Sequence, residues 1–369
     1  MKNIRNVKSQ ISFYKKSYAS KKLSKKISVL LLGLPLLVSA CGGTAASTTS
    51  KKTVYFIFTG YTPPYFAPMA QGIKAAIKHY PNLSLRILDA QGSASTEITD
   101  INEAVAAGAK GIILNPVNGS VTSAASNAMS KGVPVITIDR DLSSPSARIA
   151  FIGDKDKTLG FKQTSYGLSW LSSHNIPKPW HVAILQGTLG SSTAIDRLAG
   201  AMSALKPYIA NGSAKIVLNQ SANFDTATAT TLMNEFLAKT TNIQLVVAGN
   251  DAMALGAINA FKSHNITPGK SVVITGADAQ PESLSAISKG TQLDTVTHSP
   301  FVEAFWATEA MNNYLSSKIK PPTSQFPNGN ITIPMTLVTK SNVSKISGWG
   351  TPSIIPPLPY GKSKSYPSK

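Results

Sequence analysis

The sequence predicts an α/β protein built from two lobes with parallel sheets, and three observations support this prediction. From Thr53 onward, short runs rich in β-branched residues alternate with helical patterns, which is typical of parallel strands with crossover helices. There are eleven such runs, more than one lobe comfortably holds. The chain also has 369 residues, which exceeds the usual ~100–200 residues of one domain. Two lobes with separate cores are therefore expected.

The strands can be placed in chain order, because Gly, Pro and Asn residues bound most of the apolar runs. They are expected near residues 54–58, 85–88, 111–114, 133–138, 149–152, 182–185, 215–218, 245–248, 272–275, 295–297 and 335–338. Between them, apolar residues recur at helical spacing, as Ala70, Ile73 and Ile77 do. Residues 341–369 hold several prolines and no acidic residue, and we expect a basic, extended and partly ordered tail there.

The first forty residues have the pattern of a signal peptide. Residues 1–26 are polar and basic, and the apolar run at 27–38 is shorter than the ~20 residues that a membrane-spanning helix needs. The following Val-Ser-Ala-Cys-Gly, with its cysteine at Cys41, resembles a bacterial lipobox. This resemblance implies cleavage before Cys41 and lipidation of that residue, and residues 41–52 then suit a flexible tether.

Charge and cysteine content exclude several classes of protein. Nine of the 36 basic residues lie in residues 1–40, and between residues 41 and 339 only 22 basic side chains face 17 acidic ones. The globular part is thus mildly basic, and we expect no nucleic-acid partner. Because Cys41 is the only cysteine, an internal disulfide, a cysteine-based zinc cluster and a CxxC redox pair are excluded. We expect no cofactor and no metal.

Polar and aromatic residues follow several of the expected strands. Asp139 and Arg140, Asn250, Asp278 and His298 each end or follow a strand. Ligands of open α/β sheets bind beyond the carboxyl ends of the strands, so these side chains could converge. For each residue taken alone, capping of the next helix is an equally good interpretation.

Aromatic residues and a further arginine extend this set. Tyr65 and Phe66 follow the first strand, Arg197 lies in a helix, and Phe224 precedes a helix. Core packing explains each phenylalanine as well as a binding role does. Together, however, flat apolar faces with charged and amide groups suit a small polyhydroxylated ring.

Several segments resemble the ribose-type sugar-binding proteins of ABC importers over residues 53–340. The segments are VPVITIDRDL, ILQGTLGSSTAIDRLAG, ANFDTATA, AGNDAMALGA and ITGADAQPESLSAISKGTQLDTV. The resemblance implies a periplasmic-binding-protein type I fold, in which two doubly wound, parallel-sheet lobes are joined by a three-strand hinge. It also implies ligand-binding roles for Tyr65, Phe66, Asp139, Arg140, Arg197, Phe224, Asn250, Asp278 and His298.

Two positions depart from the family pattern. The family commonly has Asn-Pro-Phe-Phe where this chain has Pro-Pro-Tyr-Phe at 63–66, so an amide is lost. The family also often has glutamine where His298 stands. These differences favour a sugar or polyol other than ribose.

The same resemblance gives expected boundaries. Hinge strands are expected near 153–155, 297–299 and 333–335. The N-terminal lobe then comprises residues 53–153 plus 299–333, and the C-terminal lobe residues 155–297 plus 335–340. Ligand contacts from both lobes would favour closure, and the closed form would be read by an ABC permease. We expect a monomer held outside the cell membrane by its lipid anchor.

Three alternative functions remain open at this point. An enzyme would use the same charged groups, but the chain has no GxGxxG, GxxxxGK[ST], HExxH or GxSxG motif. Sugar-responsive repressors share the two-lobed core, but they carry a helix-turn-helix where this chain has its signal sequence. A receptor subunit that signals sugar occupancy to a membrane kinase or chemoreceptor would use the same closed lobes.

Overall fold

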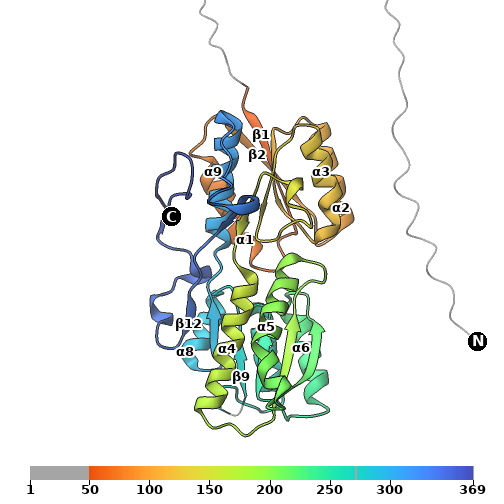
Figure 1. Cartoon of the computed structure of the whole chain (residues 1–369), viewed down its shortest axis with the longest axis vertical. Helices are drawn as coiled ribbons and strands as arrows, with labels where there is room; N and C mark the ends of the chain where they lie inside the picture. The colour runs from red at the N-terminus through yellow and green to blue at the C-terminus, as the bar shows by residue number, and fades with distance from the viewer. Residues whose placement is uncertain (1–49, 271, 369) are drawn as a thin grey trace, which may run out of the picture. The chain divides into compact units, whose positions relative to one another are not determined.

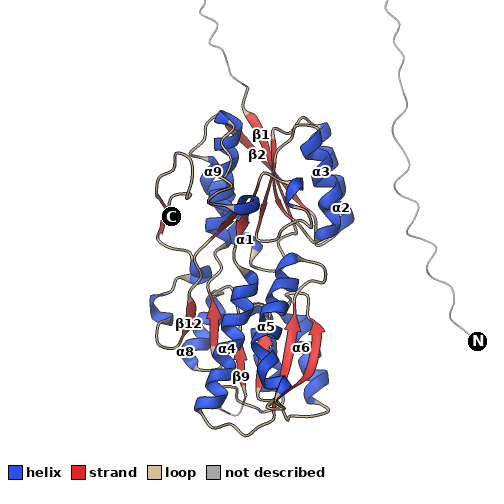
Figure 2. Ribbon diagram, in the orientation of Figure 1, coloured by secondary structure: helices blue, strands red, loops and turns tan. Residues whose placement is uncertain are grey.

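The α/β fold expected from the sequence is confirmed by a computed structural model, which describes residues 50–270 and 272–368. The signal peptide at 1–40, the lipidation site at Cys41 and most of the tether lie outside the described residues. Within the part that is described, no helix is both long and apolar enough to cross a membrane. Two six-stranded sheets organise this part of the chain (Figure 2).

The first sheet and the helices on its two faces form the first lobe. Its strands, in spatial order, are β11 (Asn330–Thr332), β5 (Ala150–Gly153), β4 (Val135–Ile138), β3 (Gly111–Asn115), β1 (Lys52–Phe58) and β2 (Leu83–Asp89), and every neighbouring pair is parallel. Helices α1 (Phe66–Ile77) and α9 (Pro300–Ser317) cover one face, and α2 (Ala94–Ala106) and α3 (Thr122–Ser130) cover the other (Figure 1).

The second sheet forms the second lobe in the same way. Its strands, in spatial order, are β12 (Leu337–Thr339), β10 (Asp294–Val296), β9 (Val273–Thr275), β8 (Leu245–Ala248), β6 (Trp180–Gln186) and β7 (Ala214–Ser221). All neighbours are parallel except β10 and β12, which are antiparallel. One face packs on α4 (Asp156–Ser173) and α5 (Ser192–Ala210), and the other on α6 (Thr226–Leu237) and α7 (Asp251–Ser263), while α8 (Pro281–Lys289) packs near β12.

The central strands are apolar throughout because both faces of each sheet are covered. Every residue of β3, β4, β5 and β8 is buried, and their sequences are continuous apolar runs with little alternation. Several helices begin at side-chain caps. Ser191 accepts a hydrogen bond from the backbone of Ala194 at the start of α5, and Asp225 accepts one from Thr228 at the start of α6.

The chain passes between the two sheets three times. The passages follow β5 at residue 153, β10 at residue 296 and β11 at residue 332. The segments expected as hinge strands, near 153–155, 297–299 and 333–335, all lie at these passages. β11 was not expected as a strand; it adds the edge strand of the first sheet by pairing with β5.

The C-terminal segment differs from the expected extended tail. It contains η4 (Val343–Lys345), η5 (Gly348–Gly350) and a small antiparallel pair, β13 (Ile354–Ile355) with β14 (Tyr366–Pro367). Apolar side chains between its prolines join the core of the first lobe, among them Ile355, Leu358 and Tyr366. Because these residues follow neither a helical nor a strand period, sequence patterns do not find them. Three further single turns are η1 (Gly119–Val121), η2 (Pro145–Ala147) and η3 (Pro327–Gly329).

Candidate ligand-binding site

A cavity with an empty volume of about 280 Å³ lies between the two lobes. Eight of the nine residues predicted from the sequence line it: Tyr65, Phe66, Asp139, Arg140, Arg197, Phe224, Asn250 and Asp278. Pro63 and Thr193 complete the lining. The ninth predicted residue, His298, lies behind the wall, where it contacts Arg197 and Asp278.

The strand ends bring these residues together, as parallel sheets with crossover helices require. Asp139 and Arg140 follow β4 directly, and Asp278 follows β9. Asn250 lies between β8 and α7, where its side chain accepts a hydrogen bond from the backbone N–H of Met253. Asn250 therefore both caps α7 and lines the cavity, so the two interpretations of this residue are compatible.

Three of the lining residues have left-handed backbone conformations. The φ angles are 60° at Asp139, 58° at Phe224 and 100° at Asp278. Such conformations are unfavourable for side chains other than glycine, most of all for a bulky one such as phenylalanine. Strain of this kind is retained where the surrounding structure over-determines a position, and it is common at functional sites. It turns each side chain sharply at its strand end.

Arg197 is the centre of a fully paired cluster of charges in the second lobe. Its Nε donates to Asp156 at 2.7 Å, and its Nη1 donates to Asp278 and to the carbonyl of Gly249, both at 2.8 Å. Burial opposes its charged form, but the carboxylates of Asp278 and Asp156 raise the pKa of Arg197. Burial would likewise raise the pKa of Asp278, yet the adjacent Arg197 guanidinium lowers it. Both groups are therefore charged.

Arg140 is held differently, by aromatic rings and neutral groups. Its guanidinium carbon lies 5.4 Å from the ring centre of Phe66 and 5.5 Å from that of Phe224, one ring from each lobe. Its Nη1 donates to the carbonyl of Val117 at 3.0 Å, while Asp139 is 3.7 Å away. Burial lowers the pKa of Arg140, although Asp139 opposes this shift. Arg140 thus keeps donors that a ligand could use.

His298 connects this wall to carboxylates behind it. Its Nδ1 lies 2.7 Å from Nη2 of Arg197, and its Nε2 lies 2.7 Å from Glu303. Burial lowers the pKa of His298, but nearby carboxylates, Glu303 foremost, raise this pKa by more than burial lowers it and so favour the charged ring. A charged ring, however, would point an N–H at the Arg197 donor. The 2.7 Å contact between Nη2 of Arg197 and Nδ1 requires an acceptor on the imidazole. Nδ1 therefore accepts this hydrogen bond, and Nε2 carries the proton of a neutral ring.

Two of the carboxyl groups near His298 are strongly perturbed. Burial raises the pKa of Asp154 to about 7 and that of Glu303 to about 8, although His298 lowers both. Both oxygens of Asp154 lack a hydrogen-bond partner, and its side chain is fully buried. Glu303 accepts a hydrogen bond from the hydroxyl of Tyr65 at 3.3 Å. The carboxyl groups near His298 therefore outnumber the single imidazole, which cannot neutralise all of them in their charged form.

Within residues 50–270 and 272–368, one group of three side chains has the spacing of metal ligands: Asp139, His298 and Glu303. A cation would have to bind Nε2 of His298, because Nδ1 faces Arg197. A neutral imidazole that binds a metal through Nε2 carries its proton on Nδ1. That proton would oppose the Arg197 donor, so the chemistry of this group does not favour a metal.

Sequence reasoning missed several residues that build the site. Thr193 lies one helical turn before Arg197 on α5, so the i, i+4 spacing could have found it. Asp156 follows β5 by three residues and could have been found as a polar group after a strand. No sequence signal marks Glu303, because it lies inside an apolar helix.

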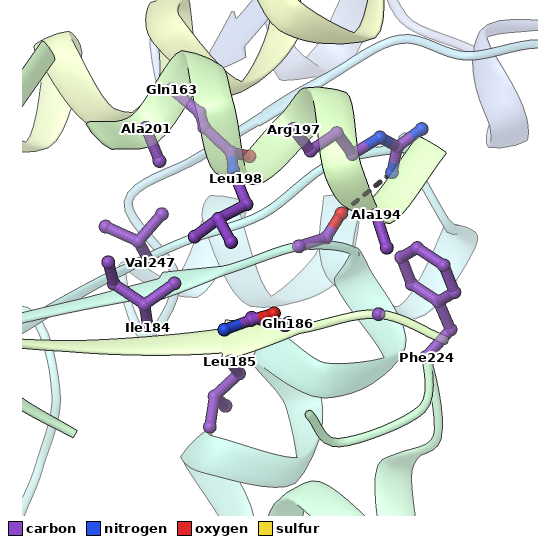
Figure 3. A pocket seen from close by; sticks show the side chains of 12 residues that line it. Gln163, Ile184, Leu185, Gln186, Ala194, Arg197, Leu198, Ala201, Phe224 and Val247 are labelled. Atoms are coloured by element: carbon purple, nitrogen blue, oxygen red, sulfur yellow. Dashed lines mark hydrogen bonds between the residues drawn. The ribbon is translucent and has the colours of Figure 1, made fainter. Parts of the chain in front are cut away.

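The two lobes contact each other beside the cavity. Ser192 Oγ accepts from the backbone of Asp141 at 2.8 Å, and Thr193 Oγ1 donates to the carbonyl of Asp139 at 3.2 Å. A second cavity of about 270 Å³ lies within the second lobe and shares Arg197 and Phe224 with the first. Figure 3 shows Arg197 reaching from α5 past Phe224, with apolar side chains below it.

Comparison with known proteins identifies the family. The periplasmic binding protein domain matches residues 54–319. Ribose import binding protein of Bacillus subtilis (strain 168) is 28% identical over 305 residues, which cover 80% of this chain and 95% of that protein. Galactofuranose-binding protein of Escherichia coli (strain K12) is 28% identical over 275 residues, with 72% and 83% covered.

Solved structures agree with these matches. The periplasmic binding protein of the arabinose ABC transporter from Shewanella sp. ANA-3, bound to L-arabinofuranose, has a TM-score of 0.70 and 27% identity, and 79% of this chain and 93% of that chain are covered. A solute-binding protein of Bacillus halodurans with bound myo-inositol has a TM-score of 0.71 and 24% identity, with 81% and 98% covered. The type I fold expected from the resemblance is confirmed. The chain belongs to the periplasmic binding protein family.

Proposed function

We propose that this protein binds one small neutral monosaccharide or polyol in the cavity between its lobes and delivers it to an ABC import permease. The observation that carries the proposal is the composition of the cavity wall. Two arginines and two aspartates balance in charge, which suits an uncharged ligand with many hydroxyl groups. The rings of Phe66 and Phe224 offer flat apolar faces for the C–H groups of such a ligand.

The division of the cavity between two lobes supports a closing mechanism. Tyr65, Phe66, Asp139 and Arg140 belong to the N-terminal lobe, proposed as residues 53–153 plus 299–333. Arg197, Phe224, Asn250 and Asp278 belong to the C-terminal lobe, proposed as 155–297 plus 335–340. A ligand that contacts both lobes stabilises the closed form only through contacts that exist when the lobes are together. The proposed role is binding without turnover.

The relatives support the ligand class. Their names specify ribose and galactofuranose, and the compared structures hold arabinofuranose and myo-inositol. A thermal-shift screen of pentoses, hexoses and inositols tests the proposal, because a ligand at 100 times its Kd adds about 2.7 kcal/mol to the stability of the folded state. One strong hit, recovered chemically intact, is expected. Unchanged melting curves with every sugar and polyol would overturn it.

We also propose that the mature protein is a monomer anchored outside the cell membrane through a lipid on Cys41. The sequence around Cys41 supports this, since a cysteine directly follows small residues and an apolar segment. A Cys41→Ser variant should lose incorporation of labelled fatty acid and move from the membrane fraction to the soluble fraction. Unchanged labelling of that variant would contradict the anchor.

A further inference from the structure

The segment around Trp349 touches both walls of the cavity from behind. The backbone N–H of Trp349 donates to the carbonyl of Ala279 at 2.6 Å, and Ala279 directly follows Asp278 in the second lobe. The indole ring of Trp349 packs edge-on against Tyr65 of the first lobe, with ring centres 5.5 Å apart and an angle of 80°. One residue therefore joins a ligand-facing tyrosine to the neighbour of a ligand-facing aspartate.

The neighbours of Trp349 attach the segment to the passage between β10 and α9. A Cβ added to Gly350 would lie 2.6 Å from Cβ of Thr297, so the backbone lies directly on that passage. Thr351 forms a hydroxyl hydrogen bond with Ser299 at 3.0 Å. After this point the chain returns to the first lobe, where Trp306 Nε1 donates to the carbonyl of Pro356. The segment is thus a fourth passage between the lobes.

The backbone at Trp349 indicates that its side chain matters. Its φ angle is 60°, a left-handed conformation that glycine adopts freely and a bulky residue does not. A strained residue persists where the surrounding contacts over-determine it. Here those contacts are the Ala279 hydrogen bond and the Tyr65 ring. Trp349 also lies beyond residues 54–319, the part that the family match covers.

Three aromatic rings contact the ring of Tyr65. It is 5% exposed and lines the cavity, and its hydroxyl donates to Glu303. Its remaining aromatic neighbours are Phe66, which also lines the cavity, and His298. Trp349, which does not line the cavity, is therefore the neighbour that connects Tyr65 to the C-terminal segment.

We propose that Trp349 is a positioning residue for ligand binding, which holds the Tyr65 ring against the cavity and ties it to the Asp278 loop. The proposal rests on the proposed function of the cavity. Aromatic edge-to-face pairs contribute about 0.5–1.5 kcal/mol in double-mutant cycles. Loss of the indole should accordingly weaken ligand binding about 2- to 10-fold.

A double-mutant cycle separates this role from a general loss of structure. Trp349→Gly removes the ring and suits the left-handed backbone, and its Kd for the sugar found in the screen is measured alone and combined with Tyr65→Ala. The Trp349→Gly penalty should largely disappear in the Tyr65→Ala background, because Trp349 acts through Tyr65. Trp349→Phe should restore most of the affinity. An equal penalty in both backgrounds, or none in either, would overturn the proposal.

Trp170→Ala is the matched control, because Trp170 stacks on His174 in the second lobe and does not line the cavity. Its Kd should equal that of the unmodified protein. If Trp349→Gly fails to fold, Trp349→Asn carries the same cycle, since asparagine also accepts a left-handed backbone.

A second measurement does not depend on a ligand. Hydrogen exchange of the peptide spanning residues 59–68 should be several-fold faster in ligand-free Trp349→Gly and unchanged in Trp170→Ala. If no sugar binds the unmodified protein, the proposed function fails, and this exchange result still decides whether Trp349 holds Tyr65. Unchanged exchange in the Trp349→Gly variant would contradict the positioning role.

Discussion

Two buried clusters of charge lie next to each other at the cavity, and burial has opposite outcomes for their carboxyl groups. The Arg197 cluster pairs its cation with Asp156 and Asp278 at 2.7–2.8 Å. The His298 cluster places one imidazole near Glu303 at 2.7 Å and near Asp154 at 3.7 Å. Burial acts on both clusters, yet the pKa of Asp278 is lowered while those of Asp154 and Glu303 are raised.

The difference teaches that burial alone does not decide the charge of a carboxyl group. Where a permanent cation is hydrogen-bonded to the acid, the charged form is retained. Where several acids share one weak base, burial wins and the acids take up protons. The Arg197 cluster presents permanent charges to a ligand, whereas the carboxyl groups of the His298 cluster bind protons behind the cavity wall.

The largest effect is expected from breaking the first cluster with Arg197→Ala. This change leaves Asp156 and Asp278 buried without their cation, which typically costs about 3–5 kcal/mol of stability. Loss of this side chain from the cavity wall, where it also holds Asp278, should raise the Kd for the ligand by tens- to thousands-fold, from a penalty of about 2–5 kcal/mol. Urea unfolding and calorimetric titration measure the two effects.

The exposed Arg86 provides the control for this change. Arg86→Ala should alter the free energy of unfolding by no more than about 0.5 kcal/mol and leave the Kd unchanged. If Arg197→Ala bound the ligand as tightly as the unmodified protein, Arg197 would not belong to the binding site.

The next largest effect is expected from Asp154→Asn, which removes one carboxyl group from the His298 cluster. The pKa of Asp154 is about 7 in the folded protein against an ordinary 3.8, so the folded state binds the extra proton. Its contribution to stability is therefore complete below pH 3.8 and is lost as the pH rises towards 7. In the variant, the loss of stability between pH 5 and pH 8 should shrink by about 2–3 kcal/mol.

Urea unfolding at the two pH values measures this change, with the exposed Glu235→Gln variant as control. Glu235→Gln should leave the pH dependence as it is in the unmodified protein. An Asp154→Asn variant with the original pH dependence would show that Asp154 is already charged in the folded state.

The smallest effect is expected from Tyr65→Phe, which removes only the hydroxyl bonded to Glu303 at 3.3 Å. One neutral hydrogen bond contributes about 0.5–1.5 kcal/mol to stability, and a loss of this size is expected in urea unfolding. The ring stays in the cavity wall, so the Kd should change less than about threefold. A rise of tenfold or more would mean that the hydroxyl contacts the ligand directly.

Much of the fold was predictable because its signals are local. All eleven expected strands are present in the two sheets, since continuous apolar runs of four to seven residues mark strands buried on both faces. The strand β11 and the pair β13–β14 were missed because their two or three residues lie among Gly, Asn, Ser and Pro residues that interrupt any apolar run. Their pairing partners lie far away in the sequence or across a proline-rich loop.

The sequence by itself determined the class of fold and the residues at the strand ends, since alternation and position after a strand depend on neighbours along the chain. Only the tertiary structure decided which of those residues carry charge and what supports them. Glu303 and Trp349 come from distant segments that no local pattern marks, and Asp154 directly follows β5 but is not distinguished by sequence from other polar residues after strands. Their roles depend on distances of a few ångströms between segments, which exist only after the chain has folded.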